Sequence, residues 1–205
     1  MMFKEKLHKN LASALSENGF EEPKPLQLKC IPKINGGSDV IGIGPDGCGK
    51  TAMVLMAAIQ KLGMAFEDAP RAMIIVAEED KALAMKEQFN LLSSNTDLRA
   101  EVVVESGKID KQTEAIYFGT DIVIGTPRRI MEIYIRKNFN ITKIKLLAFD
   151  DTEVLVKQNI FSYLERLSLS LPKCQHILFA TELNAKVEKI ADKFLINPFV
   201  VEVEG

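Results

Sequence analysis

Residues Gly44-Pro45-Asp46-Gly47-Cys48-Gly49-Lys50-Thr51 form a G-x-x-x-x-G-K-T stretch, the sequence pattern of a phosphate-binding loop. It follows the short, β-branched run Val40-Ile41-Gly42-Ile43 and precedes residues 52–62, which are apolar nearly all round. This context predicts a buried parallel strand, a tight turn and a buried helix, the arrangement that the pattern requires. A glycine-rich turn with a chance Lys-Thr is the alternative.

The loop residues are expected to bind a nucleoside triphosphate together with Mg2+. Successive backbone N–H groups of such a loop point at phosphate oxygens, and the N-terminus of the following helix adds partial positive charge. Lys50 would reach the β- and γ-phosphates, and the Thr51 hydroxyl would bind Mg2+. The expected nucleotide contacts within the loop are Gly44, Gly47, Cys48, Gly49, Lys50 and Thr51.

Length and composition favour one soluble domain. A chain of 205 residues can bury its own core, and 47% hydrophobic with 26% charged residues is ordinary for a globular protein. There is no run of about 18 apolar residues and the N-terminus is charged, so we expect neither a membrane span nor a secretion signal, and a cytoplasmic location. The three cysteines fit no zinc template. Because the net charge is −2, nucleic-acid binding would require a local basic patch.

Strand-like and helix-like segments alternate along the whole chain. Strands are expected at 40–43, 72–77, 101–104, 121–125, 145–149, 176–180 and 199–203. Helices are expected at 3–17, 52–62, 80–92, 109–118, from 126 onward, from the acidic pair at 150–151 to 171, and at 184–195. This alternation predicts one α/β domain over residues 1–205, with a mostly parallel sheet of about seven strands and helices on both faces.

Two residues ahead of the loop are candidates for recognition of the base. The turn-like segment 19–27 contains Phe20 and, seven residues later, Gln27. Phe20 would stack on adenine, and the Gln27 amide can both donate and accept a hydrogen bond at the adenine edge, a pairing that guanine does not offer. A core phenylalanine and a surface glutamine is the structural alternative.

A second acidic site is expected at the end of another strand. Asp150 directly follows the apolar run 146–149, and ligands of parallel α/β sheets gather outside the carboxyl ends of the strands. Asp150 and Lys50 can therefore converge, with Asp150 holding Mg2+ through water. Asp151 would face the water that attacks the γ-phosphate. An ordinary acidic turn before a helix is the alternative.

The order of these parts resembles the first RecA-like domain of the DEAD-box RNA helicases, and the resemblance runs from Phe3 to Val203. The segment 19–27, with Phe3 upstream, is similar to the family's Q motif, and the loop 44–51 to its motif I. Residues 81–84 stand at the place of motif Ia, 106–107 at the Gly-Gly step and 126–129 at motif Ib. Asp150-Asp151-Thr152-Glu153 stands where DEAD would stand, and Phe179-Ala180-Thr181 where SAT would.

The resemblance implies a RecA-like P-loop NTPase fold, ATP and Mg2+ as cofactors, and the backbone of single-stranded RNA as a partner, without sequence specificity. The implied RNA contacts are Lys81, Gly107, Thr126, Arg128 and Arg129. Glu153 and Thr181 would couple the ATP and RNA sites. The family's second RecA-like domain, which closes over ATP, is absent from these residues. For Arg128 and Arg129, a solvated helix face is the alternative.

The departures from the family pattern fall on residues with a role. Asp151 stands in place of Glu, which leaves its carboxylate about one methylene short of the attacking water. Glu153 replaces the final Asp of DEAD, and Phe179 removes the SAT hydroxyl. Motif Ia has lost its Pro-Thr-Arg and keeps Lys81 as its one cation.

We therefore favour an ATP-binding and RNA-binding first domain of a DEAD-box-type helicase, with Lys50, Asp150 and Asp151 as catalytic residues and weak activity in isolation. The competing hypothesis is a degenerate helicase-like protein that binds nucleotide or RNA as a scaffold, without catalysis. A nucleotide kinase is a third possibility, suggested by the Asp-Gly-x-Gly-Lys-Thr string, but it does not account for Gln27.

Overall fold

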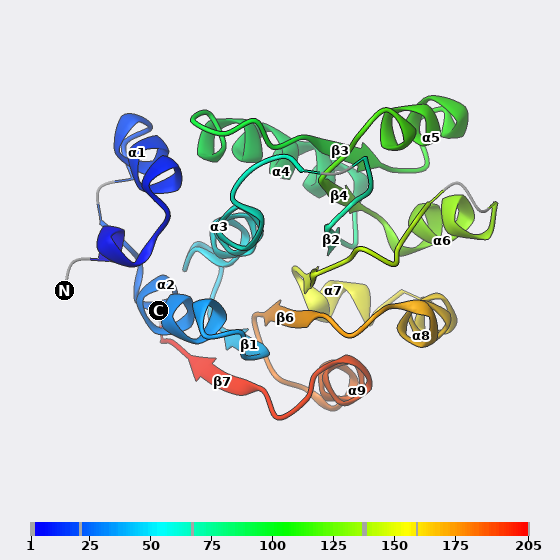
Figure 1. Cartoon of the computed structure of the whole chain (residues 1–205). Helices are drawn as coiled ribbons and strands as arrows, with labels where there is room; N and C mark the ends of the chain where they lie inside the picture. The colour runs from blue at the N-terminus through cyan, green and yellow to red at the C-terminus, as the bar shows by residue number, and fades with distance from the viewer. Residues whose placement is uncertain (1–2, 21, 67, 137–138, 159, 205) are drawn as a thin grey trace.

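The computed structural model describes residues 3–20, 22–66, 68–136, 139–158 and 160–204, and shows a parallel sheet between two layers of helices (Figure 1). The strands are β1 (Val40–Ile43), β2 (Ala72–Ile75), β3 (Ala100–Val103), β4 (Ile122–Gly125), β5 (Leu146–Phe149), β6 (Gln175–Ala180) and β7 (Phe199–Glu202). Their order is β3-β4-β2-β5-β6-β1-β7, and all neighbours pair in parallel. The predicted α/β class and seven-stranded parallel sheet are confirmed.

The strands place alternate side chains in two separate cores. In β5, Leu146 and Ala148 belong to the core on one face of the sheet, and Leu147 and Phe149 belong to the core on the other. All four residues are buried. A strand that is covered on both faces needs apolar residues at every position, which explains the continuous apolar runs in the sequence.

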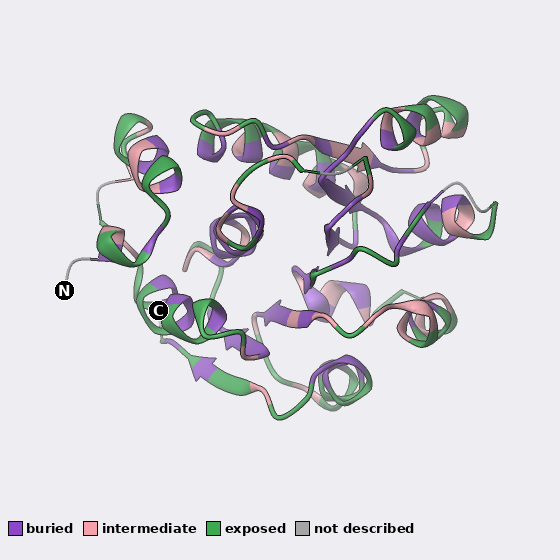
Figure 2. Cartoon of the chain, in the orientation of Figure 1, coloured by how far each residue is buried: buried purple, intermediate pink, exposed green. Residues whose placement is uncertain are grey.

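The helices divide between the two faces of the sheet (Figure 1). One layer contains the 3-10 helix η1 (Phe3–Lys6) and helices α1 (Lys9–Glu17), α2 (Pro25–Asn35), α3 (Lys50–Leu62) and α4 (Glu79–Leu92). The other contains α5 (Ile109–Tyr117), α6 (Pro127–Ile135), α7 (Thr152–Leu155), α8 (Phe161–Ser170) and α9 (Ala185–Phe194). Figure 2 shows that α3 is buried nearly all round, as its continuous apolar sequence requires.

Three predicted segments have different boundaries in the structure. The helix expected at 3–17 is divided into η1 and α1. The segment 19–27 is turn-like only as far as Lys24, because Pro25 begins α2, a position that suits proline. The helix expected to run to 171 is interrupted between α7 and α8, where the Gln158 side chain donates a hydrogen bond to the carbonyl of Ala77, 3.0 Å away.

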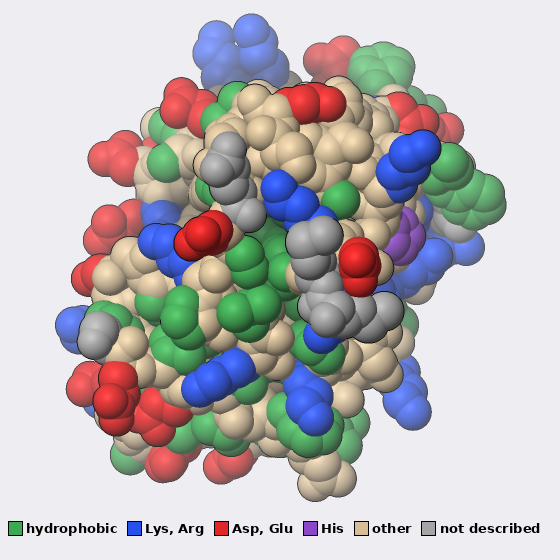
Figure 3. All heavy atoms as spheres, turned by 90° about the vertical axis from the view of Figure 1, so that its left-hand side faces the viewer, with side chains coloured by type: hydrophobic (Ala, Val, Ile, Leu, Met, Phe, Trp, Pro, Cys, Tyr) green, Lys and Arg blue, Asp and Glu red, His purple; other side chains and the backbone are tan. Residues whose placement is uncertain are grey.

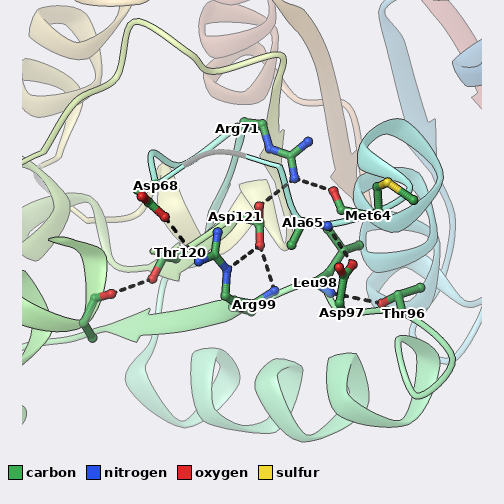
Figure 4. A network of polar contacts seen from close by, with 12 residues as sticks. Met64, Ala65, Asp68, Arg71, Thr96, Asp97, Leu98, Arg99, Thr120 and Asp121 are labelled. Carbon is green, nitrogen blue, oxygen red and sulfur yellow. Dashed lines mark hydrogen bonds and ion pairs between the residues drawn. The ribbon is translucent and has the colours of Figure 1, made fainter. Parts of the chain in front are cut away.

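A buried ion-pair network joins the amino ends of three strands (Figure 4). Asp121, at the start of β4, accepts hydrogen bonds from the Arg71 guanidinium at 2.6 Å and from Nε of Arg99 at 2.9 Å. Burial by itself would raise the pKa of Asp121, but the hydrogen bonds from Arg99 and Arg71 hold that pKa below its usual value. This network lies at the amino ends of the strands, whereas the phosphate loop lies at the carboxyl end of β1. Its role is therefore to hold the strands together.

Charges are mixed on the face that carries the N-terminal helices. Figure 3 shows Lys and Arg side chains scattered among Asp and Glu there, with apolar side chains between them.

Among the described helices, none is long and apolar enough to cross a membrane.

Candidate nucleotide-binding site

The phosphate loop connects the carboxyl end of β1 to the start of α3. The N–H of Gly44 donates to the carbonyl of Ala180 at 3.2 Å, and the N–H of Cys48 to that of Pro45 at 3.3 Å. Gly49 has a φ of +95°, and a Cβ there would lie 2.8 Å from Nε2 of Gln27. Only glycine combines this backbone conformation with so close a neighbour. The loop is therefore shaped by its glycines and packed against the Gln27 side chain.

Lys50 points into the loop. Its Nζ donates to the carbonyl of Gly44 at 2.8 Å and to that of Pro45 at 3.1 Å, and its side chain is only 5% exposed. Asp46 lies 3.4 Å from the same Nζ, yet its side chain is 93% exposed. The Asp46 carboxylate thus faces solvent, which reduces the repulsion that its charge would exert on a bound phosphate.

Thr51 and Asp150 contact each other beside the loop, at the carboxyl ends of the strands. Oγ1 of Thr51 donates to Oδ2 of Asp150 at 2.7 Å. Asp150 is fully buried, and its Oδ1 has no hydrogen-bond partner among the described residues. Burial, followed by the charge of Asp151, raises the pKa of Asp150, whereas Lys81 and Thr51 act in the opposite direction.

These oxygen atoms are ligands of the kind that hydrated Mg2+ prefers, although Nζ of Lys81 lies 3.3 Å from Oδ2 of Asp150 and an ion would have to displace it. Mg2+ prefers oxygen ligands and retains several waters when one or two protein groups and substrate phosphates hold it. Oδ1 of Asp150 is an acceptor in need of a partner, and the Thr51 hydroxyl is adjacent. Among the described residues, no group of three or more His, Cys, Asp or Glu could hold a metal by itself. A divalent ion here would therefore depend on the phosphates.

Lys81 lies at this carboxylate pair instead of on an RNA-binding face. Its Nζ is 2.7 Å from Oδ2 of Asp151 and 3.3 Å from Oδ2 of Asp150. Burial would lower the pKa of Lys81, but the two carboxylates outweigh it and raise that pKa. Asp151 itself adopts a left-handed conformation, with φ 49°, directly before α7. The residue expected to position the attacking water is thus paired with an ammonium group.

One pocket contains most of the predicted base-binding and phosphate-binding residues together, but the predicted contacts Gly44 and Cys48 are not among the residues that line it. Its volume is about 320 Å³. The residues that line it include Phe20, Gln27, Gly47, Gly49, Lys50, Thr51, Lys81 and Asp151. Phe20 is half-buried at the edge of this pocket. The side-chain oxygen Oε1 of Gln27 accepts a hydrogen bond from the backbone N–H of Lys24 at 3.0 Å. Gln27 therefore caps α2 while its amide nitrogen lies against the loop.

Lys24 is a functional candidate that the sequence did not reveal. Its Nζ donates to the carbonyl of Gly47, so it adds a second cation to the phosphate loop. A lysine three residues before Gln27 was the only available signal. Where its side chain lies depends on how α2 packs on α3.

Three of the predicted RNA contacts, Gly107, Thr126 and Arg129, are joined through the turn at 105–107, and their polar groups are engaged within the chain. Arg129 is buried and donates to the carbonyls of Glu105 at 2.7 Å and Gly107 at 3.0 Å. The Thr126 hydroxyl donates to Oε2 of Glu105 at 2.6 Å. Of the predicted RNA-binding cations, Arg128 is exposed here, and Lys81 lies in the nucleotide pocket.

The hollow beside Arg128 has an acidic lining. Its volume is about 490 Å³, and Glu78, Glu79 and Glu105 contribute to its walls together with Thr126 and Arg128. Oε1 of Glu79 also accepts the backbone N–H of Ser106 at 3.0 Å. A carboxylate thus occupies a backbone donor at the Gly-Gly step, where the resemblance implied an RNA phosphate. This geometry does not favour the predicted RNA contacts.

The expected coupling residues are Glu153 and Thr181, but the hydrogen bond between their two segments is made by Thr152. Glu153 is buried with no hydrogen-bond partner at Oε2 among the described residues, and Thr181 is half-buried. Oγ1 of Thr152 donates to the carbonyl of Phe179 at 2.9 Å. This bond connects the acidic segment after β5 to the end of β6.

A larger hollow in the described residues, of about 660 Å³, is elsewhere. Its lining includes Asp68, Asp110, Glu114, Tyr117 and Phe139, and no Lys or Arg. A phosphate-bearing ligand would meet only negative charge there, so the smaller pocket at the phosphate loop remains the candidate site.

The fold and the site define a RecA-like domain with a phosphate loop. A family model described as DEAD/DEAH box helicase matches residues 24–190. The chain belongs to the DEAD/DEAH box helicase family.

Several known proteins are similar over almost the whole chain. An ATP-dependent RNA helicase DBP10 of Scheffersomyces stipitis is 30% identical over 201 residues, which are 97% of this chain and 22% of that protein. The Emericella nidulans protein of the same name is 29% identical over 200 residues, 97% of this chain and 21% of that protein. The chain thus spans about a fifth of the length of these relatives.

Two solved structures share the fold. The crystal structure of a DEAD box protein from the hyperthermophile Methanococcus jannaschii matches with a TM-score of 0.89 at 22% identity, over 96% of this chain and 54% of that one. A variant of S. cerevisiae Dbp5 in complex with Nup159, Gle1, IP6 and ADP matches with a TM-score of 0.85 at 22% identity, over 96% and 52% of the two chains. The RecA-like fold is thereby shown.

Proposed function

We propose that this chain is the ATP-binding first domain of a DEAD-box-type RNA helicase. The observation that supports it is the single pocket in which Phe20, Gln27, the loop 44–51 and Asp151 meet. Phe20 offers a face for stacking, Gln27 lies where an adenine edge can pair, and Lys50 is already inside the loop.

Thr51 and Asp150 are the residues that would hold Mg2+. Bound there, Mg2+ supplies charge neutralisation for the phosphates. The chain's own part is to keep the Thr51 hydroxyl and the Asp150 carboxylate in contact at 2.7 Å and to shield Asp150 from bulk water. Lys50, released from the carbonyls of Gly44 and Pro45, would donate to phosphate oxygens instead.

Hydrolysis is expected to be slow in this chain alone. Asp151 is the carboxylate available to orient a water, but its Oδ2 is held 2.7 Å from Nζ of Lys81. A misplacement of about 1 Å costs roughly a hundredfold in rate. We infer that turnover requires a second RecA-like domain of the kind that the family carries, and that this domain's closure reorganises the contacts of Asp151.

Calorimetric titration with ATP, ADP and GTP tests the proposal directly. We expect ATP and ADP to bind and GTP to bind more weakly, and we expect Lys50→Ala to abolish binding. Gln27→Ala should reduce ATP affinity while leaving GTP affinity unchanged, because the lost contact is specific to adenine. No heat from any nucleotide at millimolar concentration would rule the proposal out.

RNA binding is the second part of the proposed activity. The exposed Arg128 offers a contact to a sugar–phosphate backbone, without sequence specificity. Phosphate release measured with and without single-stranded RNA tests whether RNA and ATP are coupled. Stimulation by RNA supports a helicase domain, and phosphate transfer to a nucleoside monophosphate would instead indicate a kinase.

A nucleotide-binding scaffold without catalysis is the second candidate function. Two observations favour it: Lys81 is paired with Asp151, and the RNA-facing donors of Ser106 and Thr126 are occupied by Glu79 and Glu105. ATP binding that is neither followed by phosphate release nor affected by RNA would establish this alternative.

A further inference from the structure

Lys81 forms a polar cluster with the residues assigned to Mg2+. It lies in the first turn of α4, whereas Asp150 and Asp151 follow β5 and Thr51 begins α3. Oδ2 of Asp150 accepts the Thr51 hydroxyl at 2.7 Å and also lies 3.3 Å from Nζ of Lys81. The same Nζ is 2.7 Å from Oδ2 of Asp151. One ammonium group therefore serves both carboxylates.

The position of this ammonium conflicts with a divalent ion. A hydrated Mg2+ would approach the same pair of residues, Thr51 and Asp150, that Lys81 adjoins. Two cations a few ångströms apart repel strongly where water is partly excluded. Asp150 is fully buried and the Lys81 side chain is 29% exposed, so the interaction is stronger than it would be on an open surface. Mg2+ would have to displace Lys81 from both carboxylates.

The pocket also supplies enough positive charge for phosphates without a metal. Lys24, Lys50 and Lys81 all line it. Lys24 and Lys50 contact carbonyls of the loop itself, and Lys81 lies beside Asp151. Phosphates seated in the loop would thus meet several cations. With Lys81 in place, its single positive charge offsets one of the two carboxylate charges of Asp150 and Asp151, so the pair repels the phosphates less.

We propose that Lys81 acts as an internal cation of the nucleotide site, taking the place of Mg2+ so that ATP binds with little need of a divalent ion. This inference rests on the proposed binding of ATP and specifies how that site is regulated. Through its ion pair at 2.7 Å, Lys81 also holds the Asp151 carboxylate in a fixed position. While the ion pair lasts, the Asp151 carboxylate is engaged by Lys81 and is less available to orient a water, so bound ATP persists.

The first test compares ATP affinity in excess Mg2+ and in EDTA. For the native chain, the two dissociation constants should agree within about threefold, because Lys81 already lies against both carboxylates and offsets part of their charge. Lys81→Met should weaken binding at least about tenfold in EDTA, and Mg2+ should restore it. Lys81→Arg, which keeps the charge, should behave like the native chain.

Lys111→Met provides the matched control. Lys111 is exposed on α5, outside the pocket, so its replacement removes the same formal charge from the chain without touching the site. This variant should bind ATP as the native chain does in both media. Thermal melts of all variants confirm that each is folded before the affinities are compared.

The second test needs no nucleotide. Mn2+ is added to the nucleotide-free protein and the free ion is followed by electron paramagnetic resonance. We expect the native chain to leave the free signal unchanged, Lys81→Met to bind Mn2+, and the double variant Lys81→Met/Asp150→Asn to lose that site again. The Lys81→Met result would show directly that the lysine excludes the ion.

The outcomes separate this inference from the proposed function. ATP binding that requires Mg2+ in the native chain, equal behaviour of the native chain and Lys81→Met, or equal Mn2+ binding by both would overturn the role of Lys81 and leave ATP binding intact. Absence of ATP binding in both media, for the native chain and the variant, would overturn both.

Discussion

Phe179 and Gly42 form a complementary pair directly beneath the phosphate loop. They are register partners in β6 and β1, and Phe179 is fully buried. A Cβ at residue 42 would lie 2.2 Å from the Phe179 ring, a distance that no real contact allows. The bulky residue that replaces the serine of the family's SAT motif is therefore accommodated because its neighbour lacks a side chain.

We predict that Gly42→Ala lowers the free energy of unfolding by roughly 1–3 kcal/mol, the usual cost of overpacking a core. Phe179→Leu should be mildly destabilising alone and should relieve much of this cost when the two are combined. Urea unfolding of the four proteins in this cycle measures the coupling. Gly36→Ala is the control, because a Cβ there has ordinary contacts, 3.4 Å from Pro32 and Lys33. Strictly additive effects of the two core substitutions would contradict the pairing.

At the scale of elements, the amino ends of β2, β3 and β4 depend on Asp121. Its pKa is held below the usual value despite burial, since Arg99 and Arg71 both bind the charged form. A carboxyl group with a lowered pKa in the folded state stabilises the fold above its unfolded pKa of about 3.9. That contribution is lost as the pH falls through the folded pKa.

We predict that Asp121→Asn lowers the free energy of unfolding at neutral pH by about 3–5 kcal/mol, because it leaves two guanidinium groups without their buried partner. The variant should also lose less stability than the native chain as the pH falls below about 4. Asp68→Asn is the control: Asp68 is largely exposed and 3.6 Å from Arg99, so little change is expected. Parallel pH profiles for the native chain and Asp121→Asn would refute this explanation.

A second element-scale prediction concerns the acidic surface between β2, β3 and α6. Glu79 and Glu105 accept hydrogen bonds from Ser106 and Thr126, donors that a nucleic-acid backbone would otherwise use. Carboxylates also repel phosphates. We expect Glu79→Gln/Glu105→Gln to raise the affinity for single-stranded RNA by roughly tenfold, as removal of two repulsive charges allows.

Fluorescence anisotropy with a labelled single-stranded RNA measures this change. Glu87→Gln is the control, because Glu87 lies on the same helix as Glu79 and does not line the acidic hollow. Its affinity should match that of the native chain. If the double variant and the control bind RNA equally, the two carboxylates do not restrain this surface.

At the scale of the whole molecule, the strand order places the two halves of the site together. Asp150 ends β5 and the phosphate loop follows β1, and β6 is the one strand between them. These strands lie about a hundred residues apart in the chain, yet Thr51 and Asp150 touch. A ligand held between them therefore links distant parts of the fold.

We accordingly predict that ATP stabilises the entire domain. At a nucleotide concentration a hundredfold above its dissociation constant, the free energy of unfolding should rise by about 2.7 kcal/mol. Differential scanning fluorimetry with increasing ATP measures the shift in Tm, and Lys50→Ala, which lacks the binding cation, should show none. A native chain whose Tm is indifferent to ATP would exclude tight binding.

The local pattern of residues was enough to predict the seven strands, the phosphate loop, the acidic pair after β5 and the family. These features repeat with the period of a strand or helix, or occupy a few consecutive positions. Such local patterns can be read from the sequence without knowing which segments pack together in the fold. The interruptions of the expected helices after Lys6 and after Leu155 were missed, because packing against other segments sets helix limits there.

The partners of the long charged side chains were decided by the tertiary structure alone. Lys81 contacts residues seventy positions away, Arg129 is buried beneath the turn at 105–107, and Lys24 reaches the phosphate loop. A lysine or arginine side chain has several rotatable bonds and can reach in many directions, so its partner depends on which strands and helices the fold brings beside it. For this reason the sequence predicted a nucleotide site, and only the packing of α4 against α3, β3 and β4 placed Lys81 within it.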